Sequence, residues 1–93
     1  MINQGLQKEI ISVMAKYKPT RIDIFGSYAR NEQTPHSDLD ILVDFGETVN
    51  LLDIIGIEQE LSERLGVKVD LITIRSLNPR IKQHIEKDLI SLL

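Results

Sequence analysis

Two aspartates in a run of alternating polar and apolar residues are the part of this sequence best suited to chemistry. Asp38 and Asp40 lie on either side of Leu39, at the start of an apolar segment. Residues two apart in an extended strand share a face, so the two carboxylates should point the same way. The opposite face, which should be buried, comprises Leu39, Ile41, Val43 and Phe45.

The repulsion between these carboxylates indicates which ligand they would take. An isolated Asp-x-Asp pattern is usually a solvated strand or turn. Without a counter-charge, one carboxylate of such a pair would be pushed toward its neutral form. A hard divalent cation relieves the repulsion, and Mg²⁺ favours one or two carboxylates together with substrate phosphates. Asp38 and Asp40 are therefore candidates for a magnesium–phosphate site.

A Gly-Ser pair upstream supplies a second half for such a site. Gly26 and Ser27 follow a short apolar run, and ten residues separate Ser27 from Asp38. If a helix begins at this pair, its free N–H groups and the positive end of its dipole would favour a phosphate. Gly26 would let the backbone approach closely, and Ser27 would add a hydroxyl donor. The joint pattern predicts a site for a metal-bound nucleoside triphosphate.

This pattern resembles the signature of the DNA polymerase β-like nucleotidyltransferase superfamily. Within it, the chain looks most like the minimal nucleotidyltransferases, the MNT-type antitoxins that are paired with HEPN toxins. The resemblance implies a single domain over residues 1–93 with an α/β (α+β) fold, in which helices pack on a small mixed sheet. The motif residues are Gly26-Ser27-Tyr28-Ala29-Arg30 and Ser37-Asp38-Leu39-Asp40-Ile41-Leu42-Val43.

The family also needs a third carboxylate on a neighbouring strand, and Asp70 is the candidate. It lies in the alternating run 67–73, thirty positions after Asp40, and the face opposite it is apolar. Neighbouring strands lie about 4.8 Å apart, so one site can draw on both. By resemblance, Asp38 and Asp40 would ligate two Mg²⁺ ions, while Asp70 would bind mainly the catalytic ion and help deprotonate the acceptor.

The loop between the two motifs contributes further candidates. By resemblance, Gly26 and Ser27 would hold the β- and γ-phosphates of ATP. Arg30 could either contact a phosphate or pair with an acidic side chain. Asn31 stands where the family usually has glycine, but asparagine adopts left-handed backbone more readily than most residues, so the turn should survive. His36 is expected to be a solvated loop residue.

The spacing of apolar residues predicts the elements that position this site. Asn50 should cap a central helix whose buried side includes Leu51. Leu52 and Ile57 lie beside that buried side, and they would either contact a partner or widen the buried face. The stripe of the last helix should run as far as Leu92. The expected helices cover 2–17, 50–65 and a segment starting at 78, with a short helix after Tyr28; the expected strands cover 21–25, 38–45 and 67–74.

Composition narrows the class of protein. The net charge of −3 gives no basic footprint, so nucleic acid is not expected as the main partner. Without cysteine there is no disulfide framework, thiolate metal site or cysteine nucleophile. No apolar run approaches the roughly 20 residues of a membrane span, and the N-terminus lacks the features of a signal peptide. We therefore expect a cytoplasmic protein.

The resemblance implies transfer of AMP from ATP to a hydroxyl acceptor, with a tyrosine of a HEPN toxin as the candidate. Two other hypotheses stay open. One is an antitoxin that acts by binding alone, against which the intact carboxylate set argues. The other is a stand-alone enzyme for a small molecule such as an aminoglycoside, which the lack of an obvious acceptor-binding module disfavours. Homo- and hetero-oligomers are both compatible with the sequence.

Overall fold

The computed structural model describes residues 4–46 and 49–93, and within them four strands form one sheet. The strand order is β3-β2-β1-β4; β2 runs parallel to β3, and β1 is antiparallel to β2 and β4. The predicted mixed sheet is therefore confirmed. The strands are β1 (Arg21–Phe25), β2 (Leu39–Asp44), β3 (Val69–Thr73) and β4 (Ile90–Ser91), and the helices are α1 (Gln4–Met14), α2 (Leu51–Leu65) and α3 (Pro79–Ile85).

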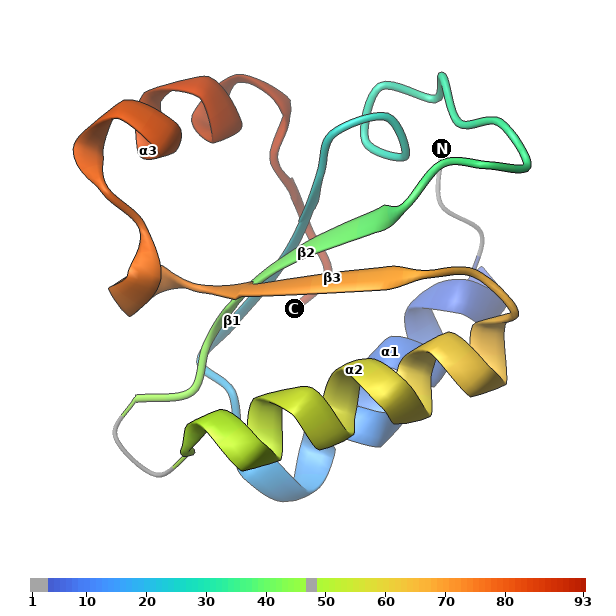
Figure 1. Ribbon diagram of the computed structural model, residues 1–93, viewed down its shortest axis with the longest axis vertical. Helices are drawn as coiled ribbons and strands as arrows, with labels where there is room; N and C mark the ends of the chain where they lie inside the picture. The colour runs from blue at the N-terminus through green and yellow to red at the C-terminus, as the bar shows by residue number, and fades with distance from the viewer. Residues whose placement is uncertain (1–3, 47–48) are drawn as a thin grey trace.

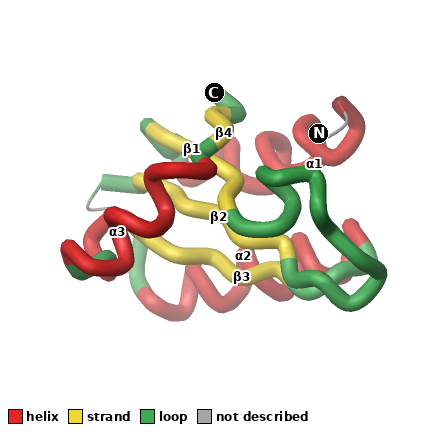
Figure 2. Tube along the Cα trace, turned by 90° about the horizontal axis from the view of Figure 1, so that it is seen from above, coloured by secondary structure: helices red, strands yellow, loops and turns green. Residues whose placement is uncertain are grey.

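The helices divide between the two faces of the sheet. Figure 1 shows α1 and α2 together on one side and α3 on the other, and Figure 2 shows the same layers from above. The loop that joins β1 to β2 rises on the α3 side (Figure 1). None of the described helices is long and apolar enough to cross a membrane.

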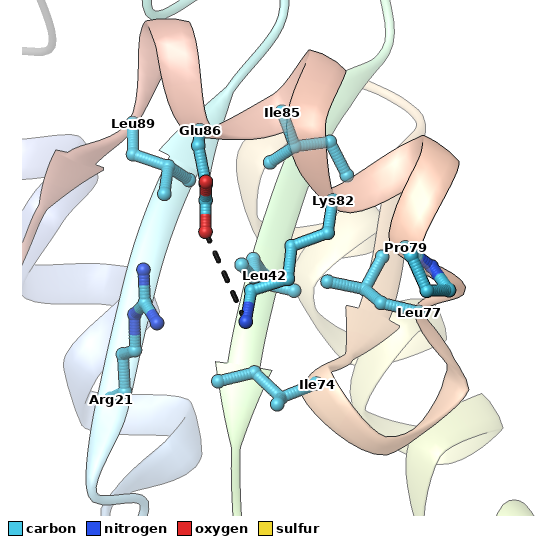
Figure 3. A pocket seen from close by; sticks show the side chains of 9 residues that line it. All are labelled: Arg21, Leu42, Ile74, Leu77, Pro79, Lys82, Ile85, Glu86 and Leu89. Carbon is cyan, nitrogen blue, oxygen red and sulfur yellow. Dashed lines mark ion pairs between the residues drawn. The ribbon is translucent and has the colours of Figure 1, made fainter.

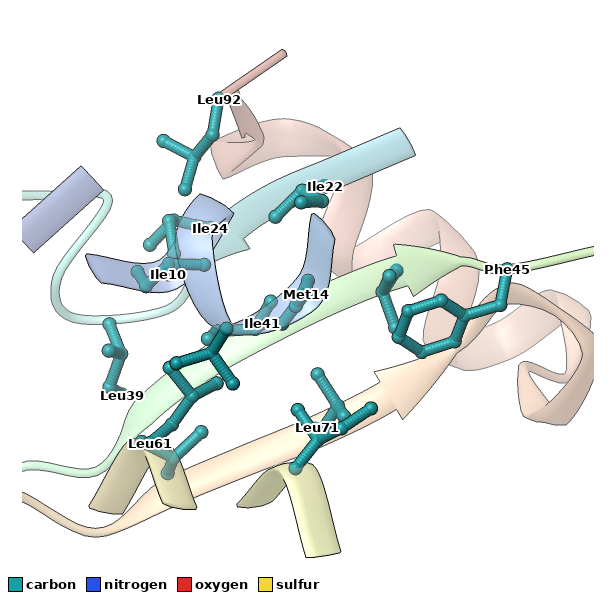
Figure 4. Close-up of a cluster of buried hydrophobic side chains, with 14 residues drawn as sticks. Ile10, Met14, Ile22, Ile24, Leu39, Ile41, Phe45, Leu61, Leu71 and Leu92 are labelled. Carbon is teal, nitrogen blue, oxygen red and sulfur yellow. The ribbon is translucent and has the colours of Figure 1, made fainter. Parts of the chain in front are cut away.

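The face toward α1 and α2 forms the hydrophobic core (Figure 4). Alternate residues of the three longer strands point into it, as the period-two pattern predicted. The side chains of α1 and α2 that meet them follow the three- and four-residue spacing of an amphipathic helix. The most deeply buried members are Ile10, Met14, Ile22, Ile24, Leu39, Ile41, Val43, Ile57 and Leu61.

The N-terminal boundary of α2 confirms the predicted cap at Asn50. The Asn50 side chain accepts a hydrogen bond from the Asp53 backbone N–H at 3.0 Å, and the Asp53 carboxylate accepts one from the Asn50 N–H at 3.2 Å. At the other end Gly66 adopts a left-handed φ of 70°. The predicted burial of Leu51 was wrong, because its side chain is 71% exposed. Ile57 is buried, which agrees with the alternative that it widens the buried face.

The predicted first helix is confirmed where the structure describes it, since α1 continues as a short 3-10 helix to Tyr17; the predicted start at Ile2 lies outside the described residues. The predicted last helix was wrong beyond Ile85. A short 3-10 helix follows α3, and the chain then adds β4 to the outer edge of β1, where Leu92 N–H donates to Ile22 C=O at 2.8 Å. This segment pairs with β1 instead of continuing the helix, because the pairing satisfies backbone groups at the free edge of β1.

Candidate active site

The three predicted carboxylates lie at one end of the sheet, on the α3 side. Asp40 and Asp70 are direct partners in the parallel pairing of β2 with β3, so both occupy the face opposite the core. Asp38 precedes β2 by one residue, and its carboxylate lies 3.8 Å from the Lys68 ammonium. Lys68 is largely exposed and is an ionic neighbour of the site.

The environment of Asp40 shows how closely these groups interact. The pKa of Asp40 is raised from its ordinary value to about 6. Burial is the largest cause, followed by the negative charges of Asp70 and Asp38, while Arg30 acts in the opposite direction. The repulsion expected from the Asp-x-Asp spacing is therefore present in the metal-free protein, and Asp70 contributes to it.

Gly26 brings the end of β1 against this acidic group. Its neighbour Phe25 pairs with Asp40 across the antiparallel β1–β2 ladder. Gly26 has a φ of +74°, and a Cβ built on it would lie 2.5 Å from Oδ2 of Asp40. Both the left-handed backbone and the missing side chain are thus required at this position. The close neighbour of Gly26 is the Asp40 carboxylate, and the approach of this backbone to a phosphate stays a prediction.

The segment after Gly26 is a single helical turn, so the predicted short helix was wrong. Arg30 N–H donates to Gly26 C=O at 3.1 Å, and Glu32 N–H donates to Ser27 C=O at 2.9 Å. The turn ends at Asn31, whose φ of 58° lies in the left-handed region. The prediction that asparagine can stand in for glycine there is confirmed, and its conformation also explains why the helix cannot continue.

Arg30 pairs with acidic side chains in this structure. Its guanidinium contacts the Asp88 carboxylate at 3.1 Å and the Glu32 carboxylate at 3.3 Å. These contacts, that with Asp88 first, raise the pKa of Arg30. Asp88 belongs to the short 3-10 helix after α3, so Arg30 connects the Gly-Ser turn to the C-terminal segment. His36 is exposed, as expected.

The acidic face suits Mg²⁺ in its chemistry. Among the described residues, no three acidic or histidine side chains converge closely enough to hold a metal ion on their own. Mg²⁺ rarely uses an all-protein cage, because it keeps waters and completes its shell with one or two carboxylates and substrate phosphates. The hard oxygen donors of Asp38, Asp40 and Asp70 and the open approach at Gly26 fit that mode of binding.

The same face of the sheet continues from the carboxylates into an apolar cavity beneath α3 (Figure 3). Leu42, two positions after Asp40, points toward α3 and lines this cavity of about 380 Å³. Arg21 lines it too, and its guanidinium donates to the buried carboxylate of Asp23. Asp23 is therefore a structural residue.

Two residues of α2 near the site were missed in the sequence. Glu58 accepts a hydrogen bond from Leu71 N–H at 2.8 Å, and Ser62 accepts one from Val69 N–H at 3.0 Å. These bonds lie on either side of Asp70 in β3. No local pattern could have indicated them, because they depend on how α2 docks along the edge of the sheet.

This fold and face define a nucleotidyltransferase, and the chain belongs to the nucleotidyltransferase domain family, which residues 7–92 match. Within the family it is a minimal nucleotidyltransferase. A Methanocaldococcus jannaschii protein, MJ0126, named as a candidate protein adenylyltransferase, is 52% identical over 90 residues, covering 96% of this chain and 92% of the relative. Protein adenylyltransferase MntA of Thermococcus cleftensis is 36% identical over 91 residues, covering 89% and 92%.

Solved structures of toxin–antitoxin complexes contain similar chains. One complex, with AMP-PNP, has a chain that matches with a TM-score of 0.85 at 28% identity, covering 94% of this chain and 72% of that one. A second complex joins a tri-AMPylated Shewanella oneidensis HEPN toxin to an MNT antitoxin. Its matching chain has a TM-score of 0.80 at 26% identity, covering 99% and 72%. The predicted superfamily and its minimal branch are both confirmed.

Proposed function

We propose that this nucleotidyltransferase transfers AMP from ATP to a tyrosine hydroxyl of a HEPN toxin and thereby acts as its antitoxin. Two relatives named for protein adenylylation support the reaction class. The similarity to a chain from a complex of an MNT antitoxin with a tri-AMPylated HEPN toxin supports the partner. The acidic balance of the chain supports a protein over a nucleic-acid acceptor, which would need a basic surface.

The acidic face provides the groups that this reaction needs. Asp38, Asp40 and Asp70 would hold two Mg²⁺ ions, which supply neutralising charge for the phosphates and the reacting oxygens. The Gly26 backbone and the Ser27 hydroxyl would bind the β- and γ-phosphates.

Arg30 would exchange its carboxylate partners, Asp88 and Glu32, for a phosphate. The exchange is inexpensive because both ion pairs are exposed to solvent and weak.

The proposed step is an in-line displacement at the α-phosphorus. The tyrosine oxygen forms a bond to this phosphorus, and the bond from phosphorus to the oxygen bridging to the β-phosphate breaks. Pyrophosphate leaves with that bonding pair, while the tyrosine proton passes to the Asp70 carboxylate. The contribution of the protein is mainly positioning and charge stabilisation, as in phosphoryl transfer generally.

One observation carries this proposal: the left-handed Gly26 turn lies directly against Asp40, which is itself paired in register with Asp70. A phosphate-binding turn and two carboxylates from different strands thus meet at one end of one face. An ordinary solvated strand face would require neither a glycine there nor a second aspartate at the paired position.

A label-transfer assay tests the proposal. The purified chain, Mg²⁺, ATP labelled at the α-phosphate and the product of the adjacent gene should yield a labelled product, with added mass in multiples of AMP. Asp40→Asn and Asp70→Asn should each reduce transfer by at least about a hundredfold. Asp44→Asn is the matched control, because Asp44 lies on the same strand and its carboxylate accepts a local hydrogen bond from Gly46 N–H.

The outcome of the assay distinguishes the hypotheses. If the wild type neutralises the partner without labelling it, and Asp40→Asn does so equally well, the chain acts by binding alone. Equal label transfer by Asp70→Asn and the wild type would remove Asp70 from the catalytic set.

A further inference from the structure

The strand that carries Asp70 lies at the edge of the sheet. In the order β3-β2-β1-β4, β3 has β2 on one side and, among the described residues, no strand on the other. Directly before β3, Leu39 N–H of β2 donates to Lys68 C=O at 2.8 Å, which fixes the direction of the backbone groups that follow. The N–H groups of alternate residues of β3, among them Val69 and Leu71, therefore point outward.

Side chains of α2 take the place of the missing neighbour. Leu71 N–H donates to Oε2 of Glu58 at 2.8 Å, and Val69 N–H donates to Oγ of Ser62 at 3.0 Å. Glu58 and Ser62 are four residues apart and thus adjacent on one face of the helix. The two acceptors bracket Asp70, so its backbone is held from both sides, by β2 and by α2.

The bond from Leu71 to Glu58 is the stronger of the two by its chemistry. A carboxylate that accepts a backbone N–H forms a charge-assisted hydrogen bond, which is roughly twice as strong as a neutral one. Glu58 is half-buried and has no basic side chain within ion-pair distance among the described residues. Ser62 offers a neutral hydroxyl and the longer contact.

We propose that Glu58 is a positioning residue for nucleotidyl transfer, which fixes Asp70 opposite Asp40 by holding the outer edge of β3. The inference rests on the proposed function, in that it takes Asp70 to be the third catalytic carboxylate. Glu58 lies on the core side of the sheet and does not touch the reacting groups. It acts through Leu71, the residue that follows Asp70.

The arrangement explains why an edge strand can serve in a catalytic site. An edge strand normally frays and offers its free N–H groups to other strands. Catalysis tolerates little displacement, since about 1 Å of misplacement can reduce the rate roughly a hundredfold. By occupying the outward N–H groups of Val69 and Leu71, Glu58 and Ser62 both restrain Asp70 and block strand addition along this part of the edge.

The test compares three variants of the full chain in the label-transfer assay. Glu58→Ala should lower kcat by about tenfold or more, with the KM for ATP changed less than about twofold, because Asp38, Asp40 and the Gly-Ser turn are untouched. Glu58→Gln should recover most of the rate, since its amide oxygen can still accept from Leu71 N–H. Glu63→Ala, an exposed change on the same helix, should behave as wild type.

Hydrogen exchange gives a second readout that does not depend on activity. In Glu58→Ala the Leu71 amide should exchange at least about tenfold faster, while the amides of the central strand β2 stay protected. Equal acceleration of the β2 amides would indicate general destabilisation and overturn the proposal. If Glu58→Ala fails to fold, Ser62→Ala provides the milder test, with faster exchange at Val69 and a smaller loss of kcat.

Two results would separate this inference from the proposed function. If Asp70→Asn loses activity but Glu58→Ala keeps the wild-type kcat while its Leu71 amide exchanges faster, the positioning role is overturned and the nucleotidyl-transfer site stands. If Asp70→Asn is as active as wild type, the assignment of Asp70 fails first, and the positioning role fails with it.

Discussion

The two faces of the central strand β2 carry opposite kinds of side chain, one residue apart. Ile41 is fully buried against α1 and α2, whereas Asp40 faces the α3 side beside two other carboxylates. Burying an aliphatic side chain lowers the free energy of folding by about 1.5–3 kcal/mol. Partly burying Asp40 and placing it close to Asp70 and Asp38 acts in the other direction, and both raise the pKa of Asp40.

One strand thus performs two tasks that conflict energetically. The apolar side chains of its core face stabilise the fold, whereas the carboxylates on its acidic face repel one another, and a bound cation would relieve that repulsion. The fold tolerates the acidic face because burial of the core face stabilises the protein by more than the repulsion between the carboxylates destabilises it. Substitutions on the two faces should therefore differ in sign as well as in size.

The largest effect is expected on the core face. Ile41→Ala should lower the free energy of unfolding by about 2–5 kcal/mol, because it removes buried methyl groups and leaves a cavity. Urea denaturation followed by circular dichroism measures the loss. Ile41→Val, the matched smaller truncation, should cost only about 0.5–1.5 kcal/mol. A loss for alanine no larger than that for valine would mean that the core collapses around the gap.

An intermediate effect is expected where the two faces meet, at Gly26. Gly26→Ala should lower stability by about 1–2 kcal/mol, because its φ of +74° disfavours a side chain, and should also displace Asp40. The thermal shift produced by Mg²⁺ and ATP should be lost.

Gly66→Ala is the control for this change. Gly66 shares the left-handed backbone, with a φ of +70°, but a Cβ there would meet nothing within 4 Å. It should lower stability to a similar extent and keep the nucleotide-dependent shift. Loss of the shift in both variants would mean that backbone strain alone is responsible.

The smallest effect, and the one of opposite sign, is expected on the acidic face. In metal-free buffer Asp40→Asn should raise stability at pH 7 by about 1 kcal/mol or less, since Asp40 is only half-buried and solvent screens its neighbours. The raised pKa of Asp40 means that the native state keeps a proton that the unfolded chain releases. As the pH rises, the stability of the wild type should therefore fall between about pH 4, near the ordinary pKa of Asp40, and about pH 6.

The pH dependence provides the check on this prediction. Urea titrations at several pH values should show the gain of Asp40→Asn over the wild type growing up to about pH 6 and then levelling off. A gain that is already complete at about pH 4 would contradict the raised pKa of Asp40 as its cause. Asp44→Asn, on the same face but further along the strand, should show no such growth.

The division of β2 and β3 into two faces was predictable from the sequence. Alternation with a period of two is a local property, and it is unaffected by how the rest of the chain packs. It placed Asp40 and Asp70 on one face and Ile41 and Leu71 on the other, as the structure shows. The Gly26 turn was predictable for the same reason, since a glycine between a strand and a polar loop is a local signal.

The parts that escaped prediction depend on tertiary contacts. Leu89 and Leu92 fit helical spacing, yet the free edge of β1 draws this segment into β4 instead. Leu51 was predicted to be buried and is exposed, because the phase of a helix against a sheet is not encoded in its own spacing. The contact between Glu58 and Leu71 likewise depends on how α2 docks against β3.

The parallel pairing of β2 with β3 also bears on the order in which the chain folds. Phe25 and Asp40 are fifteen positions apart and meet in an antiparallel pair, whereas Asp40 and Asp70 are thirty apart and meet only after α2 has crossed over the sheet. Longer-range contacts carry a greater loop-closure entropy and tend to form later. We expect pulse-labelled hydrogen exchange during refolding to show that the amides of the β1–β2 pair become protected before the amide of Leu71. A partly folded chain would then contain the Gly26 turn but lack the third carboxylate, and so would remain inactive until β3 has paired with β2.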